Sequence, residues 1–376
     1  MQFLNSHSKT HPHNLFNSLI SLASGYFRPL CSFLLLISFS VTGQEPSGSA
    51  YDWLKRMQVA IQQLNYDISL VVVEDNKVHP WHWLHGVEHL SNLDSSVDSR
   101  VDSHATEQLP TNSEAQDLPV SMSYRELELL TSLNGPTKQI VRMGDMITYL
   151  GFGQQPYSVK ASLSHSPLPD ILRTDLQQVG ANYEFTSVGK SRVAGFKAQL
   201  IRIVARDNTR YSTWIWLHEE SALPLKMAIV SSKGEVLRQV QVTSFVVSQD
   251  VDPVINELAA MELPTQNLVQ VQQNISDFDW QLRWVPRGFV PTKLNRHRLM
   301  GDREWVDYVM LSDGLVWFSV YIRDLGQVTD ANGHSTYLSS GAETYITEVV
   351  GQFEVTVIGA IPMVTAKKLA QSITQR

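Results

Sequence analysis

The chain has 376 residues, which is more than one ordinary domain needs and enough for two. Apolar residues make up 43% and charged residues 18%, so the chain can bury a core and is not disordered throughout. Its formal net charge of −7 argues against nonspecific nucleic-acid binding, which needs a basic surface.

Residues 1–43 differ from the rest of the chain. They contain no acidic residue, their only fixed cations are Lys9 and Arg28, and an apolar run occupies 30–41. A run of about 12 residues suits the core of a signal peptide and is short for a membrane span. We therefore expect residues 1–43 to be a cleaved signal peptide, with a short membrane anchor as the alternative. Cleavage would remove Cys31, the only cysteine, so no disulfide is expected.

The mature sequence opens with a predicted helix and a hairpin. Residues 51–64 carry apolar side chains at helical spacing, and Ser49 with Asp52 three residues later resembles a capping box. Residues 68–84 form two strand-like runs around a turn at 75–76, which predicts an antiparallel hairpin.

The next stretch is less regular. Residues 91–119 are polar, acidic and without apolar periodicity, and we interpret them as a disordered insertion in a loop, with an acidic docking segment as the alternative. We predict a short helix over 123–132, a hairpin over 137–150 and a second helix over 168–179.

A meander of strands completes the first domain, which we place at residues 50–247. Short connections make neighbouring strands antiparallel, so a large curved sheet should cover the two longer helices and leave an apolar groove. The predicted strands of the meander are 183–188, 196–205, 211–217, 225–231 and 235–247.

Residues 248–276 lose strand character and predict a helical turn followed by a linker, and residues 277–376 predict a small second domain. Its closing helix has an apolar stripe made of Ala366, Leu369, Ala370 and Ile373. The expected fold class is α+β, a curved antiparallel sheet followed by a smaller α+β domain. The strands predicted for the second domain are 280–285, 305–312, 315–323, 342–348 and 352–358.

The histidines at 79, 82, 85 and 89 form the densest group of metal-ligand side chains. On a strand, His82 points to the opposite face from His79 and His85, so three ligands do not converge. We therefore expect ordinary surface histidines on an edge strand, no metal and no cofactor. The sequence also lacks a nucleophile elbow, a zinc-protease helix and a dinucleotide fingerprint, so we expect a binding protein and not an enzyme.

Several segments together resemble the MucB/RseB family, over nearly all of 51–374. The segments with the greatest likeness are Val-Gly-Lys-Ser-Arg-Val-Ala at 188–194 and Ile-Arg-Ile-Val-Ala-Arg-Asp at 201–207. The acidic insertion at 91–119 departs from the family pattern. Further segments that carry the resemblance are 64–66, 135–136, 168–169, 174–175, 209–212, 223–225, 234–239, 284–289, 312–315 and 318–320.

The resemblance implies a periplasmic regulator of the sigma-E envelope-stress response. Its first domain would resemble the lipoprotein carriers, an open half-barrel over a helical plug. Such a protein binds the periplasmic part of a membrane-spanning anti-sigma factor and shields it from the site-1 protease. Binding of lipid or lipopolysaccharide would release the anti-sigma factor, and lipid, lipopolysaccharide or a mislocalised lipoprotein are possible further partners. A lipid or lipoprotein carrier without regulatory role is the alternative, and formation of a homo-oligomer stays open.

We expect two sets of contact residues, chosen from aromatic strand faces and from arginines expected to be exposed. The strand at 211–217 carries apolar bulk on both faces, so its side chains either form core or line a cavity. For ligand binding the candidates are Tyr149, Phe152, Trp214 and Trp216. For partner binding the candidates are Arg206, Arg210, Arg287 and Tyr308.

Overall fold

The computed structural model describes residues 48–89, 124–152, 155–160, 166–264, 275–298, 305–326 and 335–376. All of them belong to one compact unit, Pro46–Arg376. The expected signal peptide and the whole of the acidic insertion at 91–119 lie outside the described residues. None of the helices within these ranges is long and apolar enough to cross a membrane.

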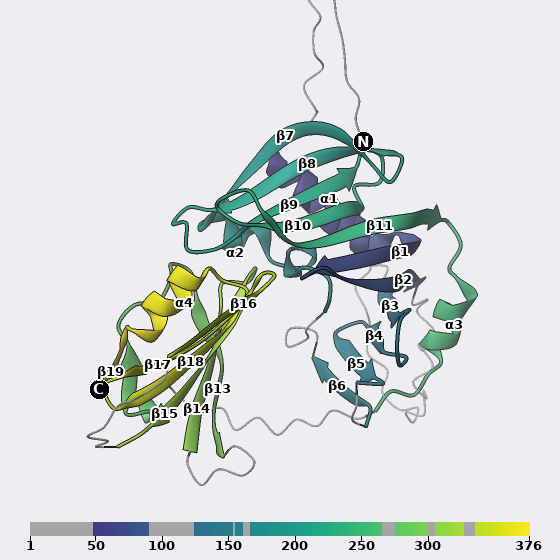
Figure 1. Cartoon of the computed structure of the whole chain (residues 1–376). Coiled ribbons are helices and arrows are strands. Elements are labelled where there is room, and N and C mark those ends of the chain that lie inside the picture. The colour runs from purple at the N-terminus through teal and green to yellow at the C-terminus, as the bar shows by residue number, and fades with distance from the viewer. Residues whose placement is uncertain are drawn as a thin grey trace, which may run out of the picture. The chain divides into compact units, whose positions relative to one another are not determined.

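The first lobe, residues 48–264, is built on one antiparallel sheet of eleven strands (Figure 1). The strand order is β6-β5-β4-β3-β2-β1-β11-β10-β9-β8-β7. The last strand, β11, therefore pairs with the first, β1, in the middle of the sheet, and β6 and β7 form its edges. In chain order the strands are β1 (Asn65–Glu74), β2 (Lys77–His89), β3 (Tyr124–Ser132), β4 (Gln139–Met143), β5 (Met146–Leu150), β6 (Tyr157–Lys160), β7 (Tyr183–Val193), β8 (Phe196–Ala205), β9 (Ser212–His218), β10 (Pro224–Val230) and β11 (Val236–Ser248).

Helix α1 (Ala50–Gln63) packs on one face of this sheet and forms the centre of the core. It begins at the predicted capping box, in which Ser49 and Asp52 bond each other's backbone amides. Leu54, Met57 and Ile61 are fully buried, and each such side chain contributes about 1.5–3 kcal/mol of burial free energy. The helix therefore depends on the sheet for its stability.

The sheet curves around α1. One apolar cluster contains Ile147 and Tyr149 from β5, near one edge of the sheet, together with Ile201 from β8, near the other edge. Strands so far apart in a sheet can share a cluster only if the sheet bends. The expected half-barrel over a helical plug is confirmed.

Among the described residues, the opposite face of the sheet is covered by a helix at one place. Helix α3 (Pro253–Ala259) places Ile255 and Leu258 against Leu127 and Leu129 of β3. Gly86 of β2 allows this contact, because a Cβ atom there would lie 2.7 Å from Ile255 Cγ2. A helical turn followed by a linker was expected over 248–276, and α3 is a helix in that segment that packs on the sheet through Ile255 and Leu258.

Two of the predicted helices are wrong or too long. Residues 123–132 form strand β3 in place of a helix, and they place Leu127 and Leu129 on one face and Glu126 and Glu128 on the other. The predicted helix at 168–179 is reduced to the 3-10 turn η2 (Asp170–Leu172) and the short helix α2 (Leu176–Gly180).

The second lobe, residues 275–376, has a six-stranded antiparallel sheet in the order β13-β14-β15-β18-β17-β16. Helix α4 (Met363–Ala370) packs on one face through Ala366, Leu369 and Ala370. Ile373, predicted in that helix, lies beyond it in β19. The other elements are η3 (Ile275–Asp277), β12 (Trp280–Leu282), β13 (Val290–Arg298), β14 (Trp305–Ser312), β15 (Trp317–Asp324), β16 (Thr336–Ser340), β17 (Glu343–Val350), β18 (Phe353–Gly359) and β19 (Ile373–Gln375).

Candidate functional site

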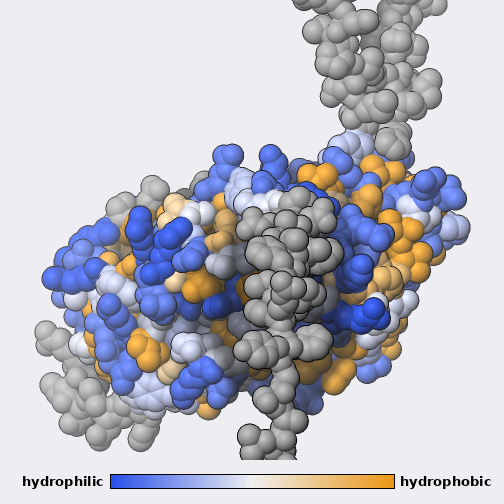
Figure 2. All heavy atoms as spheres, turned by 90° about the horizontal axis from the view of Figure 1, so that it is seen from above, coloured by the Kyte–Doolittle hydropathy of each residue, from blue (hydrophilic) through white to orange (hydrophobic). Residues whose placement is uncertain are grey.

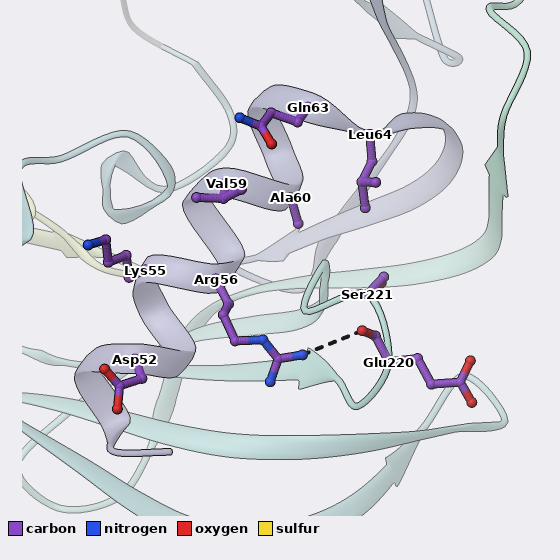
Figure 3. A pocket seen from close by; sticks show the side chains of 9 residues that line it. All are labelled: Asp52, Lys55, Arg56, Val59, Ala60, Gln63, Leu64, Glu220 and Ser221. Atoms are coloured by element: carbon purple, nitrogen blue, oxygen red, sulfur yellow. Dashed lines mark hydrogen bonds between the residues drawn. The ribbon is translucent and has the colours of Figure 1, made fainter. Parts of the chain in front are cut away.

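A groove lies between α1 and the turn that joins β9 to β10 (Figure 3). Its volume is about 490 Å³. The groove has apolar surface from Val59, Ala60 and Leu64. Arg56 of α1 reaches across the groove, where its Nη2 donates to the Glu220 carbonyl oxygen over 3.5 Å. An apolar surface bordered by charges suits an amphiphilic ligand. The other residues that line the groove are Asp52, Lys55, Gln63 and Ser221.

An aromatic cluster lies near the β6 edge of the sheet. Tyr149 stacks on Tyr157 at 5.1 Å between ring centroids and meets Phe152 edge-on at 5.5 Å. Tyr149 is buried, Phe152 and Tyr157 are half-buried, and all three pack on the same core as α1. The structure therefore places two of the four candidate ligand-binding residues, Tyr149 and Phe152, in contact with each other and with the core around α1.

Trp214 and Trp216 lie elsewhere. On β9 they alternate with Ile215 and Leu217, which are the fully buried core residues of that strand, so the tryptophans occupy the outer face. Both are half-buried, with the Arg202 guanidinium 5.2 Å from the Trp214 ring and Lys226 Nζ 4.9 Å from the Trp216 ring. Six strands separate β9 from β5.

A buried charged network lies on the inner face of β2, β3 and β4. Arg173 Nη2 lies 2.6 Å from Glu126 and 2.6 Å from Glu128, and Arg142 Nε donates to Glu128 over 3.1 Å. Arg173 follows η2, so this network ties the segment between η2 and α2 to the sheet.

His85 completes the network. Its Nδ1 lies 2.7 Å from the Leu64 carbonyl and its Nε2 lies 3.2 Å from Glu126 Oε1, so both ring nitrogens face oxygen atoms. Tyr66 stacks on the ring at 4.7 Å. The expectation of a surface histidine on an edge strand is wrong for His85, which is 1% exposed. Strand β2 lies inside the sheet between β1 and β3, and α1 packs against it.

The network holds the Glu126 side chain ionised. Burial, the largest single effect, raises the pKa of Glu126, but hydrogen bonds from His85 and Arg173 and their charges outweigh it and lower the pKa to about 2. Because the charges neutralise one another inside the lobe, the network serves to position α1, β3 and Arg173.

The histidine group forms no metal centre in the described part of the chain, where no set of three potential ligands converges. His82 Nε2 pairs with Asp67 Oδ1 at 2.7 Å on the outer face, opposite to His85. This opposite orientation is the one that strand alternation predicts.

The four candidate partner residues have different surroundings. Arg206 and Arg287 are exposed, and Tyr308 of β14 is half-buried, with its ring 5.0 Å from that of Tyr321. Arg210 is different, because its side chain is 0% exposed. The expectation that Arg210 is exposed is wrong, and Arg210 leaves the set of proposed contacts.

Tyr308 lies on the face of the second sheet opposite to α4, beside the buried residues Val306 and Met310 of the same strand. On β14 it alternates with Val309 and Leu311, which pack into the core beneath α4. Tyr308 and Tyr321 pair on the other face, and no described helix packs on that face. Half-buried aromatic side chains on a helix-free sheet face suit protein contact.

The surface as a whole mixes apolar and polar residues. Figure 2 shows one face, on which hydrophobic residues gather in patches bordered by hydrophilic ones. Exposed apolar side chains from both lobes include Val59, Val246, Trp305, Leu338 and Val364.

The sequence analysis missed the charged network, although a signal was present. Residues 126–129 read Glu-Leu-Glu-Leu, an alternation with period two that predicts a strand with one charged face. The partners His85, Arg142 and Arg173 lie in three other segments, and no local pattern connects them.

The fold and these surfaces define a two-lobed binding protein, in which a curved sheet around a helix is followed by a small α+β lobe. The MucB/RseB N-terminal domain matches residues 49–98 and 119–270, and the MucB/RseB C-terminal domain matches residues 274–374. The chain belongs to the MucB/RseB family.

The relatives match along nearly their whole length. The Sigma-E factor regulatory protein RseB of Escherichia coli K12 is 31% identical over 342 residues, 90% of this chain and 94% of that protein. The Sigma factor AlgU regulatory protein MucB of Pseudomonas aeruginosa PAO1 is 25% identical over 345 residues, 90% of this chain and 95% of that protein. The structure of the Pseudomonas aeruginosa MucA/MucB complex has a TM-score of 0.62 at 22% identity and covers 87% of this chain and 99% of that chain, so the fold is shared.

Proposed function

We propose that this protein binds the periplasmic segment of a membrane-bound anti-sigma factor and shields it from site-1 proteolysis. The observation that carries the proposal is that both MucB/RseB domains match, in order, over almost all of 49–374. The likeness to sigma-factor regulators and to MucB solved with MucA supports it further. A protein that masks its partner needs a contact surface and no catalytic group. The sheet face around Tyr308, on which no described helix packs, offers such a surface.

The proposal includes that the protein is not an enzyme. The most concentrated group of titratable side chains described above, around Glu126, is paired internally and supports the walls of the half-barrel. A catalytic group needs access to a substrate, whereas the side chains of His85 and Glu126 are 0% and 13% exposed.

Residues 1–43 support a periplasmic location in this proposal, because an apolar run of signal-peptide length follows a segment without acids. In the periplasm the protein would meet both the anti-sigma segment and lipid released from a damaged envelope.

We further propose that an amphiphile regulates the partner. The groove beside α1 and the cluster of Tyr149 and Phe152 offer apolar surface for an acyl chain. A ligand that binds the partner-free protein more tightly than the partner-bound protein lowers the affinity for the partner by the ratio of those two ligand affinities. This ratio is typically about 5- to 150-fold. Release of the anti-sigma factor would follow from this linkage without any covalent step.

A pull-down of the anti-sigma factor's purified periplasmic segment with the full chain tests the proposal, together with the rate at which site-1 protease cleaves that segment. We expect retention of the segment and slower cleavage. A segment that is neither retained nor protected contradicts the proposal. As a control, serum albumin used in place of the protein should neither retain the segment nor slow its cleavage.

The rival function is a lipid or lipoprotein carrier without a regulatory role, and the half-barrel favours it as well. Removing residues 277–376 does not separate the two functions cleanly, because Leu315 of the second lobe packs into the core of the first. Competition separates them better. A regulator loses partner affinity when a lysophospholipid binds, whereas a carrier binds the lipid and retains no anti-sigma segment.

A further inference from the structure

Arg210 of the first lobe is enclosed by side chains of both lobes. Within its own lobe, Nη1 donates to Asp207 Oδ1 over 2.7 Å. Its guanidinium lies 5.3 Å from the Tyr183 ring in the first lobe and 4.6 Å from the Phe289 ring in the second. It also donates to the carbonyl of Arg287 in the second lobe. A guanidinium can satisfy several acceptors in fixed directions at once, which a lysine cannot.

Asp313 of the second lobe is the anionic partner. Its Oδ2 lies 2.7 Å from Arg210 Nε, and neither side chain is exposed. The Tyr183 hydroxyl donates to the same oxygen over 2.7 Å. Oδ1 accepts from the backbone amides of Leu315 and Val316 over 3.0 and 2.8 Å, so the whole carboxylate is satisfied.

Burial and the Asp313 carboxylate raise the pKa of Tyr183, so this hydroxyl remains a proton donor across the physiological range. The Tyr183 hydroxyl can therefore donate its hydrogen bond to Asp313 throughout that range.

The chain also approaches itself very closely at this junction. Gly288 of the second lobe has φ +89°, and a Cβ atom there would lie 2.1 Å from Asn182 Nδ2 of the first lobe. Gly314 has φ +91°, and its Cβ would lie 3.3 Å from Val179 Cγ1. Thr365 Oγ1 donates to the Thr209 carbonyl over 2.8 Å. Both positions therefore favour glycine, because φ is positive there and a side chain would collide with the other lobe.

We infer that Arg210 and Asp313 form an interlobe lock, which holds the two lobes in one arrangement so that surfaces from both can meet a single partner. An isolated buried charge is strongly unfavourable, and each lobe carries a buried charged group that has its full set of partners only when the other lobe is in place. Arg210 is a positioning residue and does not itself contact the partner.

The test measures the distance between two spin labels, one in each lobe, in the full chain. Cys31→Ser removes the native thiol, and Val246→Cys and Val364→Cys place labels at residues that are 55% and 79% exposed. With the lock intact we expect one narrow distance distribution. Arg210→Met removes the guanidinium but keeps an apolar side chain, and it should broaden or shift the distribution. The control Arg192→Met removes an exposed arginine of β7 and should leave the distribution unchanged.

An unchanged distribution in folded Arg210→Met protein overturns the lock. If that variant fails to fold, Asp313→Asn is measured in its place, because an amide oxygen can still accept from Leu315 and Val316 while the charge is lost. An unchanged distribution in Asp313→Asn also overturns the proposal. Combining Arg210→Met with Asp313→Asn should unfold at a higher urea concentration than Arg210→Met alone, because no buried charge is left unpaired.

A second arm rests on the proposed function and uses the anti-sigma periplasmic segment as the probe. Arg210→Met should weaken its binding by about 5- to 150-fold, the usual range of coupling between sites. Weaker binding with an unchanged label distance would mean that Arg210 contacts the partner directly, and it overturns the inference. The distance measurement needs no partner, so the lock and the proposed function can fail separately.

Discussion

The charged network beneath α1 makes a quantitative prediction for Glu126→Gln. The variant keeps the shape of the side chain but removes the carboxylate that His85 and Arg173 hold ionised. The pKa of Glu126 is lowered from 4.5 to about 2. Each pKa unit corresponds to about 1.36 kcal/mol, so the ionised group contributes about 3 kcal/mol to the free energy of unfolding at neutral pH.

The pH dependence has a fixed sign. A carboxyl whose pKa is lower in the folded state contributes its full stabilisation above the unfolded pKa of 4.5 and loses it as the pH falls through the folded value of about 2. Urea unfolding of both proteins between pH 7 and pH 2 should show a deficit of about 3 kcal/mol for the variant at pH 7, which shrinks below pH 4.5.

Glu88→Gln is the matched control. Glu88 pairs with Arg125 at 2.6 Å on the same pair of strands, but its side chain is 37% exposed, so the loss should stay below about 1 kcal/mol. If Glu126→Gln costs no more than Glu88→Gln, or if its deficit is independent of pH, the assignment of the network as a buried support is refuted.

Three further predictions follow from packing. Met57→Ala on the buried face of α1 should cost about 2–5 kcal/mol in urea unfolding, against about 0.5 kcal/mol for exposed Val59→Ala; equal costs would contradict the packing of α1. Gly86→Ala should cost about 1–3 kcal/mol by pushing against α3, and an unchanged midpoint would place that helix elsewhere. Tyr149→Ala should weaken binding of a fluorescent fatty acid roughly tenfold, whereas Trp214→Phe on the outer face should not; the opposite order would place the ligand on the outer face.

Much of the sheet could be predicted because its turns carry residue types that are typical of tight turns. Asp75 and Asn76 both have positive φ, and they form the tight two-residue turn between β1 and β2 that the sequence indicated. The strands β7 to β11 have β-branched cores and short polar turns, and they lie close to the predicted ranges. Strand β3 was missed because Glu and Leu favour helices locally, whereas burial on both faces of the sheet decided the structure.

The candidate site was harder to predict, because contacts distant in sequence create it. Tyr149 and Phe152 lie close together along the chain, and they meet as expected. Trp214 was assigned to a cavity because its strand carries apolar bulk on both faces, and a sequence cannot say which of two such faces turns inward. Arg210 looked like an exposed charge in a polar turn, since its partner Asp313 comes from the other lobe.

The central claim is that the protein masks an anti-sigma factor. The most direct measurement is the rate at which site-1 protease cleaves the anti-sigma periplasmic segment as the full chain is titrated in. The account predicts that the rate falls to a low plateau at one binding equivalent and recovers when a lysophospholipid is added. Cleavage at the same rate at every concentration of the protein would contradict it.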